Sequence, residues 1–212
     1  MPTSETWPQG AAVGIALPSA TAPLRAGLSR AAPGNTAVWI LIYAEMTEFA
    51  LFFAVFLTAR WFNPEVFAAG PAQLNTRAGA LNTLVLLTSS FFMARAVAAM
   101  GQGRRRQCLK WLGLTLGAAA LYCGIKAWEY QWNGAAGIDA RTNLFFSLYY
   151  YLAFNHLLHV LIGACAVAWA AVNTALGSYS AEDHEGLESV ASYWHMIDLV
   201  WIIIFPLLYV LR

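Results

Sequence analysis

Long apolar runs, separated by short polar segments, dominate this sequence. A helix needs roughly 20 mostly apolar residues to cross the hydrocarbon core of a membrane. Five runs meet that requirement, at residues 36–59, 78–100, 109–131, 142–172 and 187–211. None shows the alternation of a membrane β-barrel strand, and backbone in lipid must satisfy its own hydrogen bonds. The pattern therefore predicts an all-α integral membrane protein, a bundle of five transmembrane helices.

Composition supports a membrane protein and excludes some functions. The chain is 59% hydrophobic and only 11% charged, whereas soluble domains carry about 25% charged residues. A net charge of +1 gives no basic face for nucleic acid, so no nucleic-acid partner is expected. Cys108, Cys123 and Cys165 lack metal-type spacing, so neither a zinc site nor a disulfide framework is expected.

The ends and loops of the chain suggest its domains and orientation. Residues 1–35 mix Ala, Pro, Gly, Ser and Thr without the apolar core of a signal peptide, which predicts a flexible or partner-ordered tail. Residues 36–212 form the membrane domain. Arg104, Arg105, Arg106 and Lys110 make the second linker cytoplasmic by the positive-inside rule. Five spans then leave the N-terminus cytoplasmic and the C-terminus periplasmic.

Several ionisable residues lie inside the predicted spans, where they are costly and mark candidate sites. Arg95 is close to the inner end of its span and is expected to reach the interface. Lys126 and Glu129 are one helical turn apart and are expected to pair.

Glu45 is the most informative of these residues. A carboxylate in lipid must hold a proton or find a partner. Glu45 is therefore expected to be buried against the fourth or fifth span, near His159 or His195. Asp198 lies one turn after His195 and is expected to share its helix face.

Three functions remain open for this polar set when the residues are taken alone. The first is a structural network that fixes helix register, and the second is a proton-conducting or lipid-headgroup site. The third is haem ligation by His156, His159 or His195. His156 and His159 share one helix, so they could not bind opposite sides of one haem. No phosphate-binding loop or nucleophile elbow is present, so no catalytic residue and no metal ligand is assigned.

Several motifs resemble those of one known family. Tyr193-Trp194-His195, followed by Asp198 and Trp201, resembles the Tyr-Trp-His-x-x-Asp-x-x-Trp signature of haem-copper oxidase subunit III, the cytochrome c oxidase subunit III-like family. Five further motifs resemble the family in the same chain order: Glu45 before Phe49, Phe52 and Phe53; Leu81-Asn82-Thr83; Glu129-Tyr130; His156-Leu157-Leu158-His159; and His184-Glu185-Gly186-Leu187-Glu188.

The resemblance implies a role without catalysis. The five spans would correspond to the last five of the seven helices in the mitochondrial-type subunit. The chain would be an accessory subunit of a respiratory electron-transport complex in a bacterial inner membrane, and would bind no cofactor except structural phospholipid. It would pack on a haem-bearing, subunit I-like catalytic subunit and on membrane lipid. Its buried polar network, with a structural, lipid or proton role, would comprise Glu45, Glu129, His156, His159, His184, Glu188, His195 and Asp198.

Finer motifs point to one branch of the family. The segments Glu45 to Phe53, Leu87 to Ser90 and Phe205 to Tyr209 look most like the proteins associated with nitric oxide reductase in denitrification. The alternative is a free-standing membrane assembly or transport factor for such a complex.

Overall fold

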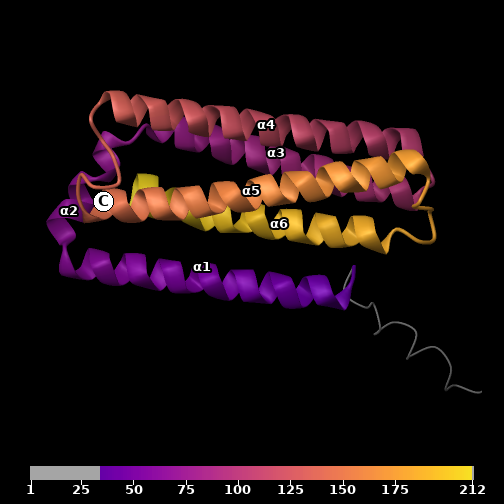
Figure 1. The fold of residues 1–212 in the computed structure, drawn as a ribbon, viewed down its shortest axis with the longest axis horizontal. Coiled ribbons are helices and arrows are strands. Elements are labelled where there is room, and N and C mark those ends of the chain that lie inside the picture. Colours follow the sequence, from indigo (N-terminus) through magenta and orange to yellow (C-terminus); the bar gives the residue numbers. More distant parts are fainter. Residues whose placement is uncertain (1–33, 212) are drawn as a thin grey trace, which may run out of the picture. The chain divides into compact units, whose positions relative to one another are not determined.

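The computed structural model describes residues 34–211, so almost all of the expected N-terminal tail lies outside the described residues. Every regular element in this range is helical (Figure 1). Five helices are long and apolar enough to cross a membrane: α1 Thr36–Phe62, α3 Thr76–Gly101, α4 Arg105–Ala135, α5 Leu144–Leu176 and α6 Glu185–Phe205, which a short turn extends to Val210. The all-α, five-span prediction is confirmed, and each helix begins and ends close to its predicted apolar run.

Asparagine side chains start three of these helices. The Oδ1 atoms of Asn35, Asn75 and Asn143 accept backbone N–H bonds of 2.8, 3.1 and 3.0 Å from the first turns of α1, α3 and α5. Such caps satisfy amide groups that have no partner within the helix. Gly177 ends α5 in the left-handed conformation, with φ of +87°, which glycine adopts without strain.

The linker between α1 and α3 is folded, which the sequence did not predict. It contains a short helix, α2 (Pro64–Ala69), and a single 3₁₀ turn, η1 (Pro71–Gln73). The ring of Phe67 packs edge-on against Phe56 of α1 and Phe145 of α5, with centroids 5.1 and 5.6 Å apart. These contacts attach the linker to the ends of two transmembrane helices.

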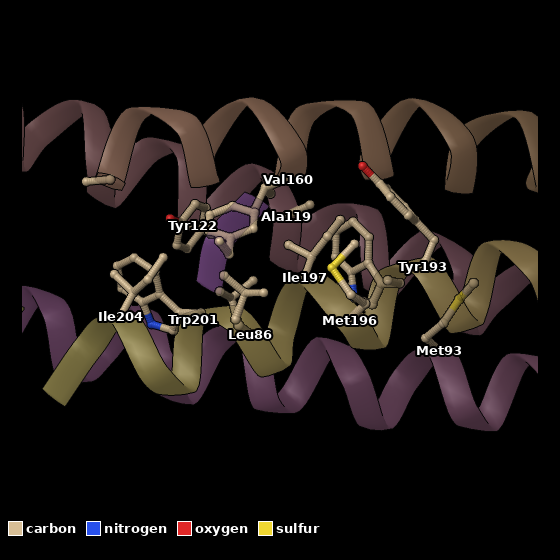
Figure 2. Packing of buried hydrophobic residues seen from close by; sticks show 14 of the residues in the cluster. Leu86, Met93, Ala119, Tyr122, Val160, Tyr193, Met196, Ile197, Trp201 and Ile204 are labelled. Carbon is tan, nitrogen blue, oxygen red and sulfur yellow. The ribbon is translucent and has the colours of Figure 1, made fainter. Parts of the chain in front are cut away.

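Helix α6 lies at the centre of the packing and contacts α1, α3 and α5. Its Trp194 and Trp201 are fully buried, and their indole Nε1 atoms donate to Ser89 and Thr83 of α3 at 3.1 and 3.0 Å. Figure 2 shows Trp201 beside Tyr122 of α4, the two ring centroids being 5.5 Å apart. Hydrogen bonds across helices satisfy these polar ring atoms inside an apolar core.

The last predicted span changes its helical geometry near its end. Residues 187–211 were expected to form one continuous helix, but α6 ends at Phe205 and a π-helical turn, η2, covers Pro206–Val210. Proline has no N–H to continue the α-helical ladder, so the backbone bonds shift at this residue. The turn places Tyr209 in the protein interior, where it is 2% exposed.

Helix α1 is the least buried of the five. Only 17% of its most apolar 18-residue window is buried, against 61% for α6 (Figure 1). Polar contacts hold both ends of α1. Gly34 N and Asn35 N donate to side chains of Glu188 and Ser189, and Arg60 donates to the carbonyl of Leu211 at 3.1 Å. Between these ends, Phe49 and Phe56 of α1 are buried in the core of the bundle, so apolar packing and polar contacts together hold the helix.

Candidate functional site

The polar residues singled out in the sequence form several separate groups within residues 34–211. Glu129 belongs to a fully buried cluster on α4, Glu45 pairs with His159, and His184 lies beside Glu188 at the start of α6. The remaining three, His156, His195 and Asp198, take part in none of these ion pairs. Within residues 34–211 these side chains therefore form local groups, each with its own chemistry.

The first group surrounds the carboxylate of Glu129. Lys126 Nζ lies 3.0 Å from Oε2, as expected from the spacing of these residues, and neither side chain is accessible. Tyr149 and Tyr209 both donate to Oε1, at 3.0 and 2.6 Å. A carboxylate with three donors is well satisfied without water. The two tyrosines were missed in the sequence, because Tyr209 is 80 residues from Glu129 and belongs to the turn after α6.

Aromatic rings enclose the cation of this pair. The Nζ atom of Lys126 lies 5.0 to 5.6 Å from the ring centroids of Tyr130, Tyr149, Trp201 and Tyr209. It also donates a 2.8 Å bond to the hydroxyl of Tyr209. The negative faces of aromatic rings attract a desolvated ammonium group. This cluster ties α4, α5 and the end of α6 together at one depth.

The second group joins α1 to α5. Glu45 Oε2 lies 2.7 Å from His159 Nε2, with the side chains 19% and 10% exposed, respectively. This confirms the prediction that Glu45 faces the fourth span near His159, although burial is incomplete. His159 Nδ1 lies 2.8 Å from the carbonyl oxygen of Asn155. A carbonyl can only accept, so Nδ1 carries a hydrogen.

That tautomer has a consequence for the other ring nitrogen. One further proton must lie between Nε2 of His159 and Oε2 of Glu45, either on the imidazole or on the carboxyl group, because two acceptors would repel at 2.7 Å. The pair therefore shares a hydrogen across this contact, within the membrane-spanning part of the chain. Next to it, Asn155 donates to the exposed Glu48 of α1 at 3.2 Å.

Two of the residues singled out in the sequence, His156 and Asp198, are buried within residues 34–211 without ordinary hydrogen bonds. His156 is fully buried with neither ring nitrogen bonded, and its ring lies 5.0 Å from Trp201 and 5.9 Å from Tyr122. Asp198 is 4% exposed, and its oxygens make no bond of ordinary geometry although Ser90 is near. Buried polar atoms of this kind bind ordered water or carry a proton.

His195 is bonded across helices rather than to Asp198. Its Nδ1 lies 2.6 Å from Ser90 Oγ on α3. His184 Nε2 and Glu188 Oε1 are 3.6 Å apart, and both are half-buried at the end of the bundle rather than within it. These two residues therefore stabilise the start of α6 and its contact with Gly34.

Neither histidine of α5 offers an accessible, unbonded ring nitrogen to a haem. His159 uses both ring nitrogens within the chain, and aromatic side chains surround His156. Residues 34–211 also contain no cluster of three His, Cys, Asp or Glu side chains suited to a metal ion. The fold and the site define a multi-pass membrane protein whose polar groups join its helices.

Comparison with known proteins gives the family. The family model for cytochrome c oxidase subunit III matches residues 24–211. Cytochrome c oxidase subunit 3 of Thermostichus vulcanus is 31% identical over 175 residues, covering 81% of this chain and 84% of the relative. The protein of the same name from Synechocystis is 32% identical over 177 residues, covering 82% of this chain and 74% of the relative. The chain belongs to the cytochrome c oxidase subunit III family.

More distant relatives cover the chain equally well. The probable cytochrome c oxidase subunit 3 of Mycobacterium tuberculosis is 28% identical over 178 residues, which is 84% of this chain and 87% of the relative. The match to the family model, at residues 24–211, extends over all five membrane-spanning helices of the described residues.

Proposed function

We propose that this chain is a non-catalytic accessory subunit of a haem-copper oxidase, bound to the haem-bearing catalytic subunit within a bacterial inner membrane. The observation that carries this proposal is the family match over residues 24–211, which includes every membrane-spanning helix. Basic residues in the α3–α4 loop support a cytoplasmic N-terminus and a periplasmic C-terminus.

An exposed acid in α1 supports a protein partner. Glu48 is at the middle of this 27-residue helix, and its exposed side chain accepts a hydrogen bond of 3.2 Å from Asn155 of α5. A carboxylate facing hydrocarbon is costly, and such groups usually face protein or water. A partner helix with a hydrogen-bond donor opposite Glu48 would remove that cost.

Two features support a role in proton supply and lipid organisation. The Glu45–His159 pair holds one proton between two helices. A groove of about 490 Å³ opens beside it, lined by Glu45 with apolar residues of α1, α5 and α6. We propose that this groove accepts a phospholipid and that the pair exchanges its proton there.

Within the family, we propose the branch associated with nitric oxide reductase. The support is the resemblance of Glu45-Met46-Thr47-Glu48-Phe49 and of Leu87-Thr88-Ser89-Ser90 to that branch. Oxygen reduction by the partner is the competing assignment, since the relatives compared above are named as cytochrome c oxidase subunits.

Affinity purification from native membranes tests the proposal. A tagged chain, extracted in a mild detergent, is expected to bring down a haem-bearing membrane subunit, whose consumption of nitric oxide and of oxygen then distinguishes the two branches. Recovery of the chain without a haem protein would contradict the accessory role.

Gene deletion separates the accessory role from the alternative of an assembly factor. If the chain is an accessory subunit, its deletion is expected to leave the haem content of the catalytic subunit unchanged. The deletion should then shorten the time for which the catalytic subunit stays active during turnover. Loss of haem from the catalytic subunit would instead favour assembly.

A further inference from the structure

A groove between α3 and α4 lies on a side of the protein that does not include Glu45. At one end, close to the loop that joins the two helices, is a cavity of about 400 Å³ lined by Arg95, Arg104, Gln107, Lys110, Trp111 and Leu114. Three of these six residues are cationic and none is acidic. This end therefore attracts anions.

The cavity continues into an apolar channel. Leu114 also lines a second cavity of about 350 Å³, whose other walls are apolar side chains of α3 and the small residues Gly117 and Ala118 of α4. A methyl group added at Gly117 would meet no atom within 4 Å, so the space above this residue is open. The channel reaches Leu121, where a third cavity begins.

The dimensions of the groove match one leaflet of a bilayer. Lys110 and Leu121 are eleven residues apart, which at a rise of 1.5 Å per residue gives about 16 Å along α4. Half of a hydrocarbon core of about 30 Å is about 15 Å. The cationic cavity therefore lies about one acyl-chain length from the end of the apolar channel.

Contacts within the protein hold the side chains at the cationic end of the groove in place. The guanidinium of Arg95 lies over the Trp111 ring, 5.6 Å from its centroid, and Trp111 packs on Phe92 with centroids 5.7 Å apart. An indole ring with a nearby cation is suited to the headgroup level of a membrane. By contrast, Arg105 of the same loop donates to the carbonyl of Thr174 on α5 and does not line the cavity.

We propose that the α3–α4 groove is a binding site for an anionic phospholipid, with its phosphate among Arg95, Arg104 and Lys110 and one acyl chain along Gly117. Basic pockets between transmembrane helices bind such headgroups. The site uses different helices from the Glu45 groove and does not depend on the identity of the catalytic partner.

Native mass spectrometry of the full chain in detergent tests the proposal. Phosphatidylglycerol is the probe, and phosphatidylcholine with the same acyl chains is the comparison. We expect retention of one phosphatidylglycerol in preference to phosphatidylcholine. An attraction of about 1 kcal/mol per cation corresponds to roughly fivefold in affinity, so the triple variant R95Q/R104Q/K110Q should bind about 100-fold more weakly.

Two further variants distinguish binding of the headgroup from binding of the acyl chain. Arg106→Gln is the control for charge, because it removes a cation from the same loop that does not line the cavity. It should change the affinity for phosphatidylglycerol by less than about threefold. Gly117→Leu fills the apolar channel and should weaken lipid binding while all three cations remain.

Three results would overturn the proposal. The first is equal binding of phosphatidylglycerol by the triple variant and the unaltered chain. The second is equal binding of the two lipids, as expected of a groove reserved for a partner helix. The third is displacement of the lipid by millimolar inorganic phosphate together with no effect of Gly117→Leu, which would indicate an anion site without an acyl-chain site.

Discussion

Lys126 and Glu129 form an ion pair with no accessible surface inside a transmembrane helix, their Nζ and Oε2 atoms being 3.0 Å apart. The pair carries no net charge, and the hydroxyls of Tyr149 and Tyr209 complete its hydrogen bonding. Removing one partner leaves a buried charge unpaired, whereas removing both does not. This difference can be measured.

Lys126→Met is expected to destabilise the bundle by about 3–5 kcal/mol, because Glu129 then lacks its cation in a dry interior. The double variant K126M/E129Q should be less destabilised than K126M alone. Unfolding in mixed micelles with increasing SDS provides the measurement. Equal stability of the single and double variants would show that the pair is not coupled.

Glu65→Gln serves as the control for this experiment. Glu65 lies in the short helix α2, is exposed and forms no ion pair within residues 34–211. Its replacement should change the unfolding free energy by less than about 0.5 kcal/mol.

A second prediction concerns the contact between α5 and α6. A Cβ atom at Gly163 would lie 2.7 Å from Ile197 Cδ1 and 3.0 Å from Trp194 Cε3. Gly163→Ala should therefore cost about 1–3 kcal/mol through overpacking. Gly113→Ala is the matched control, because a Cβ there meets nothing within 4 Å. It should be neutral or stabilising by up to about 1 kcal/mol. Similar effects of both changes in an SDS titration would contradict the close packing at Gly163.

A third prediction tests the attachment of α1. Glu45→Ala removes the acceptor opposite His159 and should cost about 1.5–3 kcal/mol, the range for a hydrogen bond to a charged group. Glu45→Gln keeps a polar group there and should cost less. Disulfide trapping between cysteines introduced on α1 and α5 measures their separation. An unchanged rate of disulfide formation in Glu45→Ala would mean that the Glu45–His159 pair does not hold α1 against α5.

A fourth prediction concerns haem. The isolated chain, mixed with haem in detergent, is expected to show no Soret shift that depends on His156 or His159, because one is enclosed by aromatic rings and the other is bonded at both nitrogens. The same measurement on the variant His195→Ala tests the third histidine that the sequence offers as a haem ligand. A Soret band that this change abolishes would reverse the conclusion.

The sequence predicted the spans well because their signal is local. Each apolar run is long enough to define a membrane helix by itself, and the i, i+3 spacing of Lys126 and Glu129 was sufficient to predict their pairing. Local signals failed where a partner is distant in the chain. Nothing near Glu129 indicates Tyr209, and nothing near His195 indicates Ser90, which is 105 residues away.

The grouping of the polar residues could not be predicted for a related reason. A helix turns 100° per residue, so residues on one span face different neighbours. His156 faces the aromatic core while His159, one turn later, faces Glu45 of α1. Sequence motifs identified which polar residues are unusual, but their grouping depends on how the helices pack.

The attachment of α1 has a consequence for the synthesis of the chain. Its polar partners on α5 and α6 follow it by 107 to 154 residues. During translation α1 is inserted before these partners are synthesised, so its polar groups lack them until the last two spans have followed. We therefore expect the polar attachment of α1 to form late in biogenesis, so that a ribosome stalled before α5 would leave Glu45 and Glu48 without these partners.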